Sequence, residues 1–585
     1  MKNLPVCKIR YDHVGYGVLF PKKFFVAFSA NDVWENGKIR DSLAHPIFRI
    51  QSEQNQFLFT DKLKYRGDCG YTDEVLFEGD FSKFQILGRF RIVVLVGEDV
   101  LDRSHFFEIS SELLYRQLKA NVKSFYFQRS GVELSPEFAG KWARPAAHID
   151  DKLKFHSMMN REGSWNAHGG WYDAGDYGKY IVNGGVSVAT LMLACELQLS
   201  SRNLSAILNG EGLKPSFEQP FGLLEEIRFE LEFFLRMQDE DGGVFFKVTP
   251  GHWDGFMMPI DSDTMQKRFV MGKSTTSTLN FAGVMAQAHH VFKATAPYGK
   301  DSNEMTLFAE SCLSAAVRAY AWALANPHAD YPHNTEGSGG YGDEHFEDEF
   351  FWARAMLFRE FCDPSLKNRF FLQDFDFAEA IKSDLEQNPM ILGLNWRDTQ
   401  NLGWLALAFN ESPDLDSRGF KQRAFEEIFK TADEILRLQN SDAYGISIRK
   451  FIWGSNGEIA NHALTLLVAF RISRKIAYRD AALELVHFIY GRNPVDVSFV
   501  TGSAWSSPMF PHHRICHSDG VESPIPGLLV GGINNDRQDL HRMPHYPGDL
   551  PGLAYTDERC SFASNETAIN WNAPLTTVLA LLLFP

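Results

Sequence analysis

The sequence predicts a mainly α-helical chain in which a closed ring of helical hairpins follows a small β-sandwich. Three observations lead to this prediction. Short strand-like runs fill the N-terminal part of the chain, and the hydrophobic period changes from two to about 3.6 near residue 110. Two later helical stretches also end alike, in "LRMQDEDGGVFF" from Leu235 and "LRLQNSDAYGIS" from Leu436, which indicates that helix hairpins repeat.

The N-terminal runs are rich in β-branched and aromatic residues and are separated by Gly, Asp and Asn turns. They cover residues 22–30, 56–60, 74–81 and 88–97. Several short strands this close together predict a small sandwich. We place its boundary near "FFEISSELLYRQLKANVKSFYF", so that the β-domain covers residues 1–109 and the helical domain covers residues 110–585.

From there, the long periodic stretches predict helices. In residues 221–238 the apolar positions recur at i, i+3 or i+4 and form one stripe, made by Leu223, Leu224, Ile227, Leu231, Phe234 and Leu235. The same pattern predicts helices over residues 425–439 and 461–477. Loops that join such helices at one end of the ring would build the functional site.

Composition and charge exclude some classes of function. The net charge of −16 argues against nucleic acid and anionic membrane surfaces as partners. The seven cysteines are odd in number and show no CxxC spacing, which predicts free thiols in a reducing compartment. The N-terminus lacks the apolar segment of a secretory signal, and no run approaches the roughly 18 apolar residues that cross a bilayer. If Met1 is the natural start, we therefore expect a soluble, cytoplasmic protein.

The stretch "GGWYDAGDYGKY", residues 169–180, places Asp173 and Asp176 three residues apart among glycines and aromatic residues. Two interpretations fit this pattern. Asp and Gly are common in turns that cap a helix. A pair of carboxylates can instead hold one water molecule beside a sugar.

Glu566 stands in "SNETAINWNAPL", just before a strongly apolar C-terminal helix, with Asp557 nine positions earlier. A carboxyl group among apolar and aromatic neighbours has a raised pKa, which suits a general acid. The structural alternative is a first-turn residue that complements the helix dipole.

A third stretch, "GRNPVDVSFVTGSAWSSPMFPHHR", ends in His512, His513 and Arg514. Adjacent histidines suggest a metal, but no carboxylate or cysteine stands at a ligand-like spacing, so we do not expect metal catalysis. His and Arg also donate hydrogen bonds that orient hydroxyl-rich ligands. The pair His289 and His290 lies inside a helical stretch, where we expect a structural role.

Together, two aspartates in one loop, a distant glutamate and donors from a third segment resemble the acid and base pair of an inverting glycosidase. The chain resembles glycoside hydrolase family 9, best known for endoglucanases. The similarity rests on "GGWYDAGDYGKY", on "YTDERCSFASNETAINWNAP" and on an ordered series of further segments, which are "KIRYDHVGYG", "LRMQDEDGGVFFKV", "YGDEHFEDEFFWA", "WGSN", "GRNPVDVSFVTG", "PHHR" and "IPGLLVGGIN". It implies an (α/α)6 barrel, a toroid of six hairpins, behind an immunoglobulin-like module.

The resemblance also implies residue roles. Asp176 is the general base, Asp173 helps to hold the attacking water, and Glu566 is the general acid. Trp171 and Tyr172 bind substrate or support the loop, and His512, Arg514 and Asp557 contact or orient groups around the cleavage point. The chemistry requires no cofactor. A structural calcium or zinc ion occurs in this family, but no ligand set for either can be assigned in this sequence.

The expected substrate is an oligosaccharide of β-1,4-linked glucose, cleaved by a cellodextrinase-, cellobiase- or endoglucanase-like enzyme. The main alternative in the same family is an exo-β-D-glucosaminidase that acts on chitosan oligosaccharides, because surplus acidity suits a cationic sugar. Acidic residues at 343–349 would then contribute, unless they form a solvated helix start. A catalytically inactive sugar-binding protein is less consistent with the presence of Asp176 and Glu566.

One segment departs from the family pattern. Before "PHHR" the family usually has a glycine and then a basic or amide residue, where this chain has Ala504 and Ser506. We expect these two positions to border the sugar cleft, which puts the usual cellulose-binding contacts in doubt.

Overall fold

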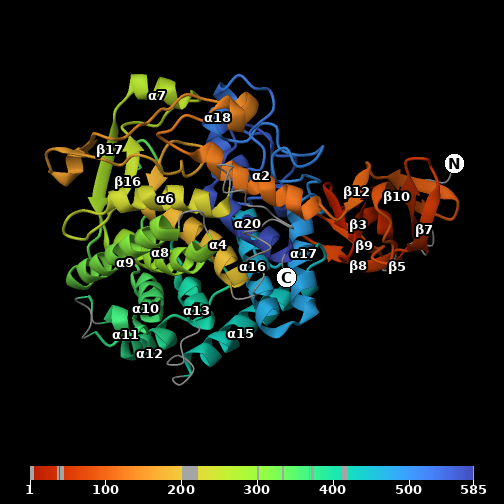
Figure 1. Ribbon diagram of the computed structural model, residues 1–585. Coiled ribbons are helices and arrows are strands. Elements are labelled where there is room, and N and C mark those ends of the chain that lie inside the picture. Colours follow the sequence, from red (N-terminus) through yellow and green to blue (C-terminus); the bar gives the residue numbers. More distant parts are fainter. Residues whose placement is uncertain are drawn as a thin grey trace.

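The structure is a computed structural model that describes residues 6–35, 38–39, 45–199, 222–298, 302–331, 335–367, 369–370, 375–410 and 419–583. Figure 1 shows its two parts side by side, with strands of the N-terminal region at one side and the helices of the rest of the chain at the other. The predicted fold class, a β-sandwich followed by an (α/α)6 barrel, is confirmed.

Two mainly antiparallel sheets form the sandwich, and their inner faces pack around one apolar core. The first sheet has the order β1 (Cys7–Arg10), β3 (Lys23–Ser29), β9 (Glu74–Asp80) and β8 (Lys64–Cys69). The second has the order β2 (Gly15–Gly17), β12 (Phe107–Ser110), β10 (Gly88–Val96), β6 (Pro46–Ser52) and β7 (Phe57–Lys62), with β11 (Asp99–Arg103) paired to β10. β2 and β12 run parallel, and β4 (Trp34–Glu35) and β5 (Lys38–Ile39) form a separate ribbon.

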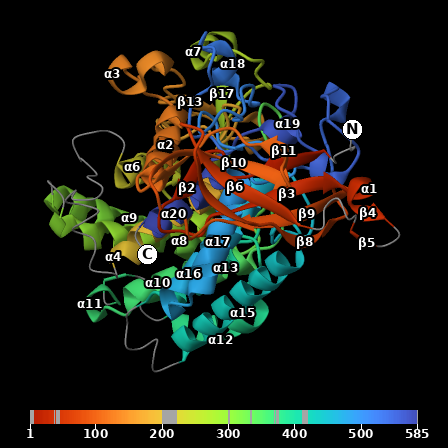
Figure 2. The same ribbon diagram turned by 90° about the vertical axis from the view of Figure 1, so that its right-hand side faces the viewer.

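Strand β3 shows why the N-terminal runs are so apolar. Alternate residues of a strand face opposite sides of its sheet. Phe24, Val26 and Phe28 belong to the core of the sandwich, whereas Phe25 and Ala27 belong to the core shared with the helical part. Both faces of β3 are therefore buried, and the sandwich packs on the barrel through this sheet, which Figure 2 shows in front of the helices.

Polar contacts fix this junction. His487 Nδ1 lies 2.7 Å from Asp12 Oδ2, and both side chains are buried. The Tyr444 hydroxyl donates to Glu74 at 2.6 Å. β12 ends at Ser110, and α2 (Leu113–Gln128) begins three residues later.

The helices alternate along the chain between an outer and an inner ring. The outer helices are α2, α6 (Leu223–Met237), α9 (Ser302–Ala325), α12 (Phe377–Gln387), α15 (Phe420–Ser441) and α17 (Ile476–Ile489). The inner helices are α4 (Ile181–Leu199), α8 (Thr275–Thr295), α10 (Glu347–Phe361), α13 (Gln400–Ala408), α16 (Ser455–Ser473) and α20 (Ile569–Leu583). Inner helices pack on one another, α20 on α4, α4 on α8 and α8 on α10, and they are buried on almost every side.

Helix α4 illustrates the inner ring. Its window Ile181–Gln198 is long and apolar enough to cross a membrane by length and composition, contrary to our expectation that no such run exists, but 94% of that window is buried inside the structure. Burial on all sides explains the apolar composition, because a core helix faces no water on any side.

The helix predicted over residues 461–477 is interrupted. α16 ends at Ser473, Arg474 adopts a left-handed conformation with φ of 59°, and α17 begins at Ile476. The Arg474 N–H donates to the Phe470 carbonyl at 2.7 Å, which closes the helix end. The apolar period continues across this turn because both helices bury a face, so the sequence pattern does not reveal the break.

A small sheet covers one end of the barrel. Its order is β14 (Ser164–Trp165), β13 (Leu153–Phe155), β17 (Arg268–Lys273), β16 (Phe245–Pro250) and β15 (Lys179–Tyr180). Figure 1 shows β16 and β17 together with α7 (Pro259–Met265) and α18 (Arg514–Ser518) above the helices. Among the described residues, the remaining short α-helices are α1 (Ala30–Val33), α3 (Pro136–Ala139), α11 (Pro364–Lys367) and α19 (Phe562–Asn565).

Candidate active site

A cavity of about 690 Å³ lies at the end of the barrel where inner helices begin, and Asp173, Asp176 and Glu566 all line it. The structure thus brings together the two acids of one loop and a third from the other end of the sequence. Aromatic side chains form much of the remaining wall, and they come from Tyr180, Trp253, Tyr341, Trp396, Trp453 and Trp571.

The lining residues precede or begin the inner helices. Tyr180 immediately precedes α4, Tyr341 precedes α10, Asp398 precedes α13, Gly454 precedes α16 and Ala568 precedes α20. The N-terminal ends of these helices therefore point toward the cavity. Because a helix N-terminus carries a partial positive charge, this arrangement favours carboxylates there.

Two glycines shape the loop that carries Asp173 and Asp176. Gly170 has φ of +80°, and a Cβ on it would lie 2.6 Å from the Phe233 ring. A Cβ on Gly175 would lie 2.0 Å from the carbonyl oxygen of His512. Glycine at 175 therefore lets this loop pack directly on the backbone of the "PHHR" segment.

Backbone hydrogen bonds join the three segments that the sequence singled out. The Arg514 N–H donates to the Gly175 carbonyl at 2.9 Å, and the Ile569 N–H donates to the Asp173 carbonyl at 2.9 Å. The His512 N–H donates to the Asn565 carbonyl at 2.8 Å, next to Glu566. The positions of the three carboxyl groups are therefore set by main-chain contacts as well as by packing.

Asp173 is 2% exposed and is held at both of its oxygens. Asn183 Nδ2 donates to Oδ1 at 2.6 Å, and the Tyr341 hydroxyl donates to Oδ2 at 2.5 Å. Burial raises the pKa of Asp173 to about 7, and the charge of Asp176 acts in the same direction, whereas these two donors oppose the rise. Asp173 is thus a rigid carboxyl group that titrates near neutral pH.

Asp176 lies three residues further along the loop and is 7% exposed. Burial raises its pKa, whereas the positive charge of Arg514, a backbone hydrogen bond from Gly178 and the charges of Lys247 and Arg268 lower it. Asp173 is held by two neutral donors, whereas the charges of three cations act on Asp176. Of the pair, Asp176 is the better candidate for the ionised member.

Glu566 lies between α19 and α20. Of the three carboxyl groups, it has the strongest tendency to remain protonated. Burial raises its pKa well above the usual value, and the charges of Asp176 and Asp173 raise it further, against the opposing effects of Arg514 and a hydrogen bond with Trp453. One cavity therefore contains a carboxyl group whose pKa is raised well above its usual value and another in which positive charges oppose the rise, an asymmetry that suits paired general acid and base catalysis.

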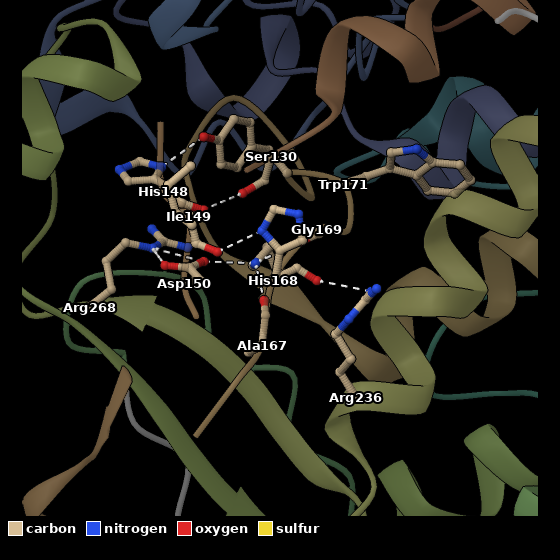
Figure 3. A network of polar contacts seen from close by, with 12 residues as sticks. Ser130, His148, Ile149, Asp150, Ala167, His168, Gly169, Trp171, Arg236 and Arg268 are labelled. Carbon is tan, nitrogen blue, oxygen red and sulfur yellow. Dashed lines mark hydrogen bonds and ion pairs between the residues drawn. The ribbon is translucent and has the colours of Figure 1, made fainter. Parts of the chain in front are cut away.

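A buried ion network contacts the backbone just before this loop, and Figure 3 shows Asp150, Arg268, Ala167 and Gly169 in it. Asp150 Oδ2 lies 2.7 Å from Lys179 Nζ, and Asp150 Oδ1 lies 3.0 Å from Arg268 Nε. Lys179 also donates to the carbonyls of Ala167 and Gly169, at 2.9 and 2.7 Å. Because all three charged side chains are buried, each depends on the others for compensation. The network fixes the backbone path that enters the Asp173 loop.

Trp171 and Tyr172 have a supporting position. Each is 1% exposed, so neither ring is available to a sugar. Trp171 packs against Phe125 with ring centroids 4.9 Å apart, and the Tyr172 hydroxyl lies 2.7 Å from His148 Nδ1.

Within the described part of the chain, His512, Arg514 and Asp557 do not line this cavity, and Asp557 lines a separate cavity between the sandwich and the barrel. Arg514 Nε donates to the Asp254 carbonyl at 3.0 Å, and its charge acts on Asp176 and Glu566. His512 Nδ1 lies 2.5 Å from the Arg559 carbonyl. Asp557 accepts the N–H groups of Met509 and Phe510, at 2.7 and 2.9 Å, and so orients the backbone before "PHHR".

The expectation that Ala504 and Ser506 border the sugar cleft is wrong. Ser506 Oγ contacts His13 Nδ1 in the sandwich, and the Trp505 indole between them donates to the Tyr11 hydroxyl at 3.3 Å. Trp505 lines a separate cavity between the sandwich and the barrel. Ser506 and Trp505 therefore contact the β-domain, and neither Ala504 nor Ser506 lines the cavity of Asp173, Asp176 and Glu566.

Sequence reasoning missed the groups that hold Asp173. Tyr341 lies in the segment "YGDEHFEDEFFWA", and Asn183 follows the Asp173 loop at the start of α4. Nothing local distinguishes these two side chains from other buried polar residues. The aromatic Trp253 and Trp453, which are 53% and 40% exposed, lie in loops whose path the sequence does not indicate.

No metal centre can be assigned. Within the described residues, no group of three or more His, Cys, Asp and Glu side chains is arranged to hold a metal ion. The seven cysteines are free. His289 and His290 lie in α8, where His289 Nδ1 contacts Glu360 in the protein interior.

The chain is similar to known proteins over nearly its whole length. Residues 115–579 match the model of glycosyl hydrolase family 9. The chain is 34% identical to the xyloglucan-specific endo-β-1,4-glucanase of Bacteroides ovatus over 99% of this chain and 94% of that protein. It is 28% identical to the cellodextrinase of Butyrivibrio fibrisolvens over 98% and 99% of the two chains.

Similarity extends to the fold. A solved family 9 structure from Bacteroides ovatus superposes with a TM-score of 0.81 at 30% identity and covers 98% of both chains. Because the family model spans most of the chain and these similarities include the β-domain, the chain belongs to glycoside hydrolase family 9, a family of O-glycoside hydrolases.

Proposed function

We propose that this protein hydrolyses β-1,4-glucosidic bonds in gluco-oligosaccharides with inversion of the anomeric carbon. The observation that carries the proposal is the single cavity that contains Asp173, Asp176 and Glu566 in three different environments. An inverting glycosidase requires one ionised carboxylate beside a water molecule and one protonated carboxylic acid beside the leaving oxygen.

The proposed reaction is a single displacement. Asp176 takes a proton from the water as the water oxygen bonds to the anomeric carbon, and Asp173 holds the same water. Glu566 gives its proton to the glycosidic oxygen as the bond to the anomeric carbon breaks. Asp176 ends protonated and Glu566 ionised, and exchange with solvent restores both.

The substrate assignment draws on the relatives and on the cavity wall. The relatives are named for a β-1,4-glucanase and a cellodextrinase activity. Partly exposed Trp253 and Trp453 offer apolar ring surface beside polar groups, which suits the mixed faces of a sugar.

A second candidate substrate is an oligosaccharide of β-1,4-linked glucosamine. Five carboxyl groups line the cavity, those of Asp173, Asp176, Asp398, Glu458 and Glu566, and among the described lining residues none is Lys, Arg or His. A negative cavity favours a cationic sugar. The acidic residues at 343–349 do not line the cavity: Asp343, Asp348 and Glu349 are buried, whereas Glu344 and Glu347 are exposed to solvent.

Product analysis with matched tetramers of β-1,4 glucose and β-1,4 glucosamine separates the two substrates. We expect faster cleavage of the glucose tetramer. Its sugar units are neutral, so they add no positive charge beside the catalytic carboxyl groups, which must gain or lose a proton during the reaction. Products released one or two units at a time would indicate exo action, whereas internal cleavage would indicate endo action. Faster release of glucosamine would contradict the glucan assignment, and Glu458→Gln should then lower kcat/KM for that substrate by about tenfold or more.

A further inference from the structure

Lys247 is a buried cation in the wall behind the Asp173 loop that the proposed reaction does not use. It lies on β16, and its side chain is fully buried. β16 pairs with β15, which places Lys247 directly opposite Tyr180 in the register of the two strands. Tyr180 lines the cavity and ends the stretch that begins with Asp173 and Asp176.

The ammonium group of Lys247 holds a neighbouring backbone segment. Its Nζ donates to the Gly339 carbonyl at 3.0 Å and to Ser338 Oγ at 3.4 Å. The Tyr180 hydroxyl donates to the same Gly339 carbonyl at 2.8 Å. Two residues further along, Tyr341 donates to Asp173, so the segment that Lys247 fixes is the one that positions Asp173.

The charge of the same ammonium group also acts on Asp176. Three cations lower the pKa of Asp176, Arg514, Lys247 and Arg268 in order of decreasing effect. The charge of Asp176 in turn raises the pKa values of Asp173, Glu566 and Tyr180. Burial lowers the pKa of Lys247 to about 8 while the charge of Asp176 acts in the opposite direction, so Lys247 is cationic below that pH.

We propose that Lys247 is a positioning residue for the catalytic aspartates, which fixes the Gly339–Tyr341 segment and supplies a positive charge that keeps Asp176 ionised. The inference rests on the proposed role of Asp176 as the general base. This role explains why a lysine, whose burial is energetically unfavourable, is fully buried on β16 behind the site.

The test is the pH profile of kcat/KM for Lys247→Gln, which removes the charge but keeps an N–H donor for the Gly339 carbonyl. Without the positive charge the carboxylate of Asp176 is less stable, so its pKa rises and the acidic limb of the profile moves to higher pH by about one unit. At pH values on the acidic limb, kcat/KM of the variant is then about tenfold lower than that of the wild type, whereas the value on the plateau changes little.

Thr249→Val is the matched control, because Thr249 lies on the same strand and its Oγ1 contacts Ser338 Oγ at 2.7 Å without carrying charge. We expect its acidic limb to remain at the wild-type position. Lys247→Met is the second variant, which loses both charge and donor and should show the shifted limb with a lower plateau. Thermal unfolding of each variant shows which of them are folded at the assay temperature.

A folded Lys247→Gln or Lys247→Met enzyme whose acidic limb stays in place would overturn the inference, and so would an equal fall at every pH. An equal shift in Thr249→Val would also overturn it, since loosening of the segment would then suffice. Failure of the proposed function is distinguishable: if Asp176→Asn retains wild-type activity, Asp176 is not the base, whatever Lys247 does.

Discussion

Glu566→Gln should lower kcat for an oligosaccharide by about 10³-fold without changing the unfolding temperature by more than a degree or two. Glutamine preserves the volume of the side chain but has no proton to give to the leaving oxygen. The effect is large because burial and the charges of Asp176 and Asp173 hold the pKa of Glu566 well above its usual value, which keeps this group protonated for the reaction. Steady-state kinetics on the tetramer, with thermal unfolding of both proteins, measures the change.

An activated substrate provides the control for Glu566→Gln. An aryl glycoside that releases a dinitrophenolate ion needs no proton at its leaving oxygen, so the variant should cleave it at a rate within about tenfold of wild type. A wild-type rate on the natural oligosaccharide would show that Glu566 is not the acid. An equal loss on both substrates would also contradict the role, because it would indicate damage to the site rather than a missing proton.

Asp176→Asn should be equally severe, with a loss in kcat of about 10³-fold or more. An amide side chain cannot take the proton that leaves the attacking water. Asp176 is the member of the pair that Arg514, Lys247 and Arg268 favour as an anion, so its neutral replacement removes the carboxylate assigned to this step. The acidic limb of the pH profile should disappear as well, because the titrating base is absent.

Two controls identify the defect in Asp176→Asn. Azide is an anion that attacks without losing a proton, so it should restore turnover and yield the glycosyl azide of α configuration, while Glu566 still protonates the leaving oxygen. Asp173→Asn removes a charge from the same loop and should lose less activity than Asp176→Asn. A larger loss in Asp173→Asn would exchange the roles of the two aspartates.

Structural features that depend on residues close together in the sequence were predictable. The strand runs at 22–30, 74–81 and 88–97 correspond to β3, β9 and β10, because the alternation of a strand depends only on neighbouring residues. The loop of Asp173 and Asp176 was recognisable for a related reason. Two carboxyl groups among glycines and aromatic residues are unusual within one short stretch, and Gly170 and Gly175 mark a backbone that packs closely on other segments.

Features that depend on distant contacts were not predictable. Tyr341 and Asn183 matter because they reach the two oxygens of Asp173 from 168 and 10 residues away. Ser506 was assigned to the cleft, although its contact with His13 spans 493 residues of sequence. A sequence motif shows which residues belong together along the chain, but the fold decides which cavity each of them faces.

The stereochemistry of the product tests the central claim most directly. Proton NMR of the reducing end, recorded during the first minutes of cleavage of whichever tetramer reacts faster, distinguishes the two anomers before they interconvert. A direct attack by the water that Asp173 and Asp176 hold, with Glu566 as the acid, predicts that the α-anomer appears first and the β-anomer grows later by mutarotation. Appearance of the β-anomer first would mean a covalent glycosyl-enzyme intermediate and would contradict the direct attack of water and the roles of Asp173 and Asp176.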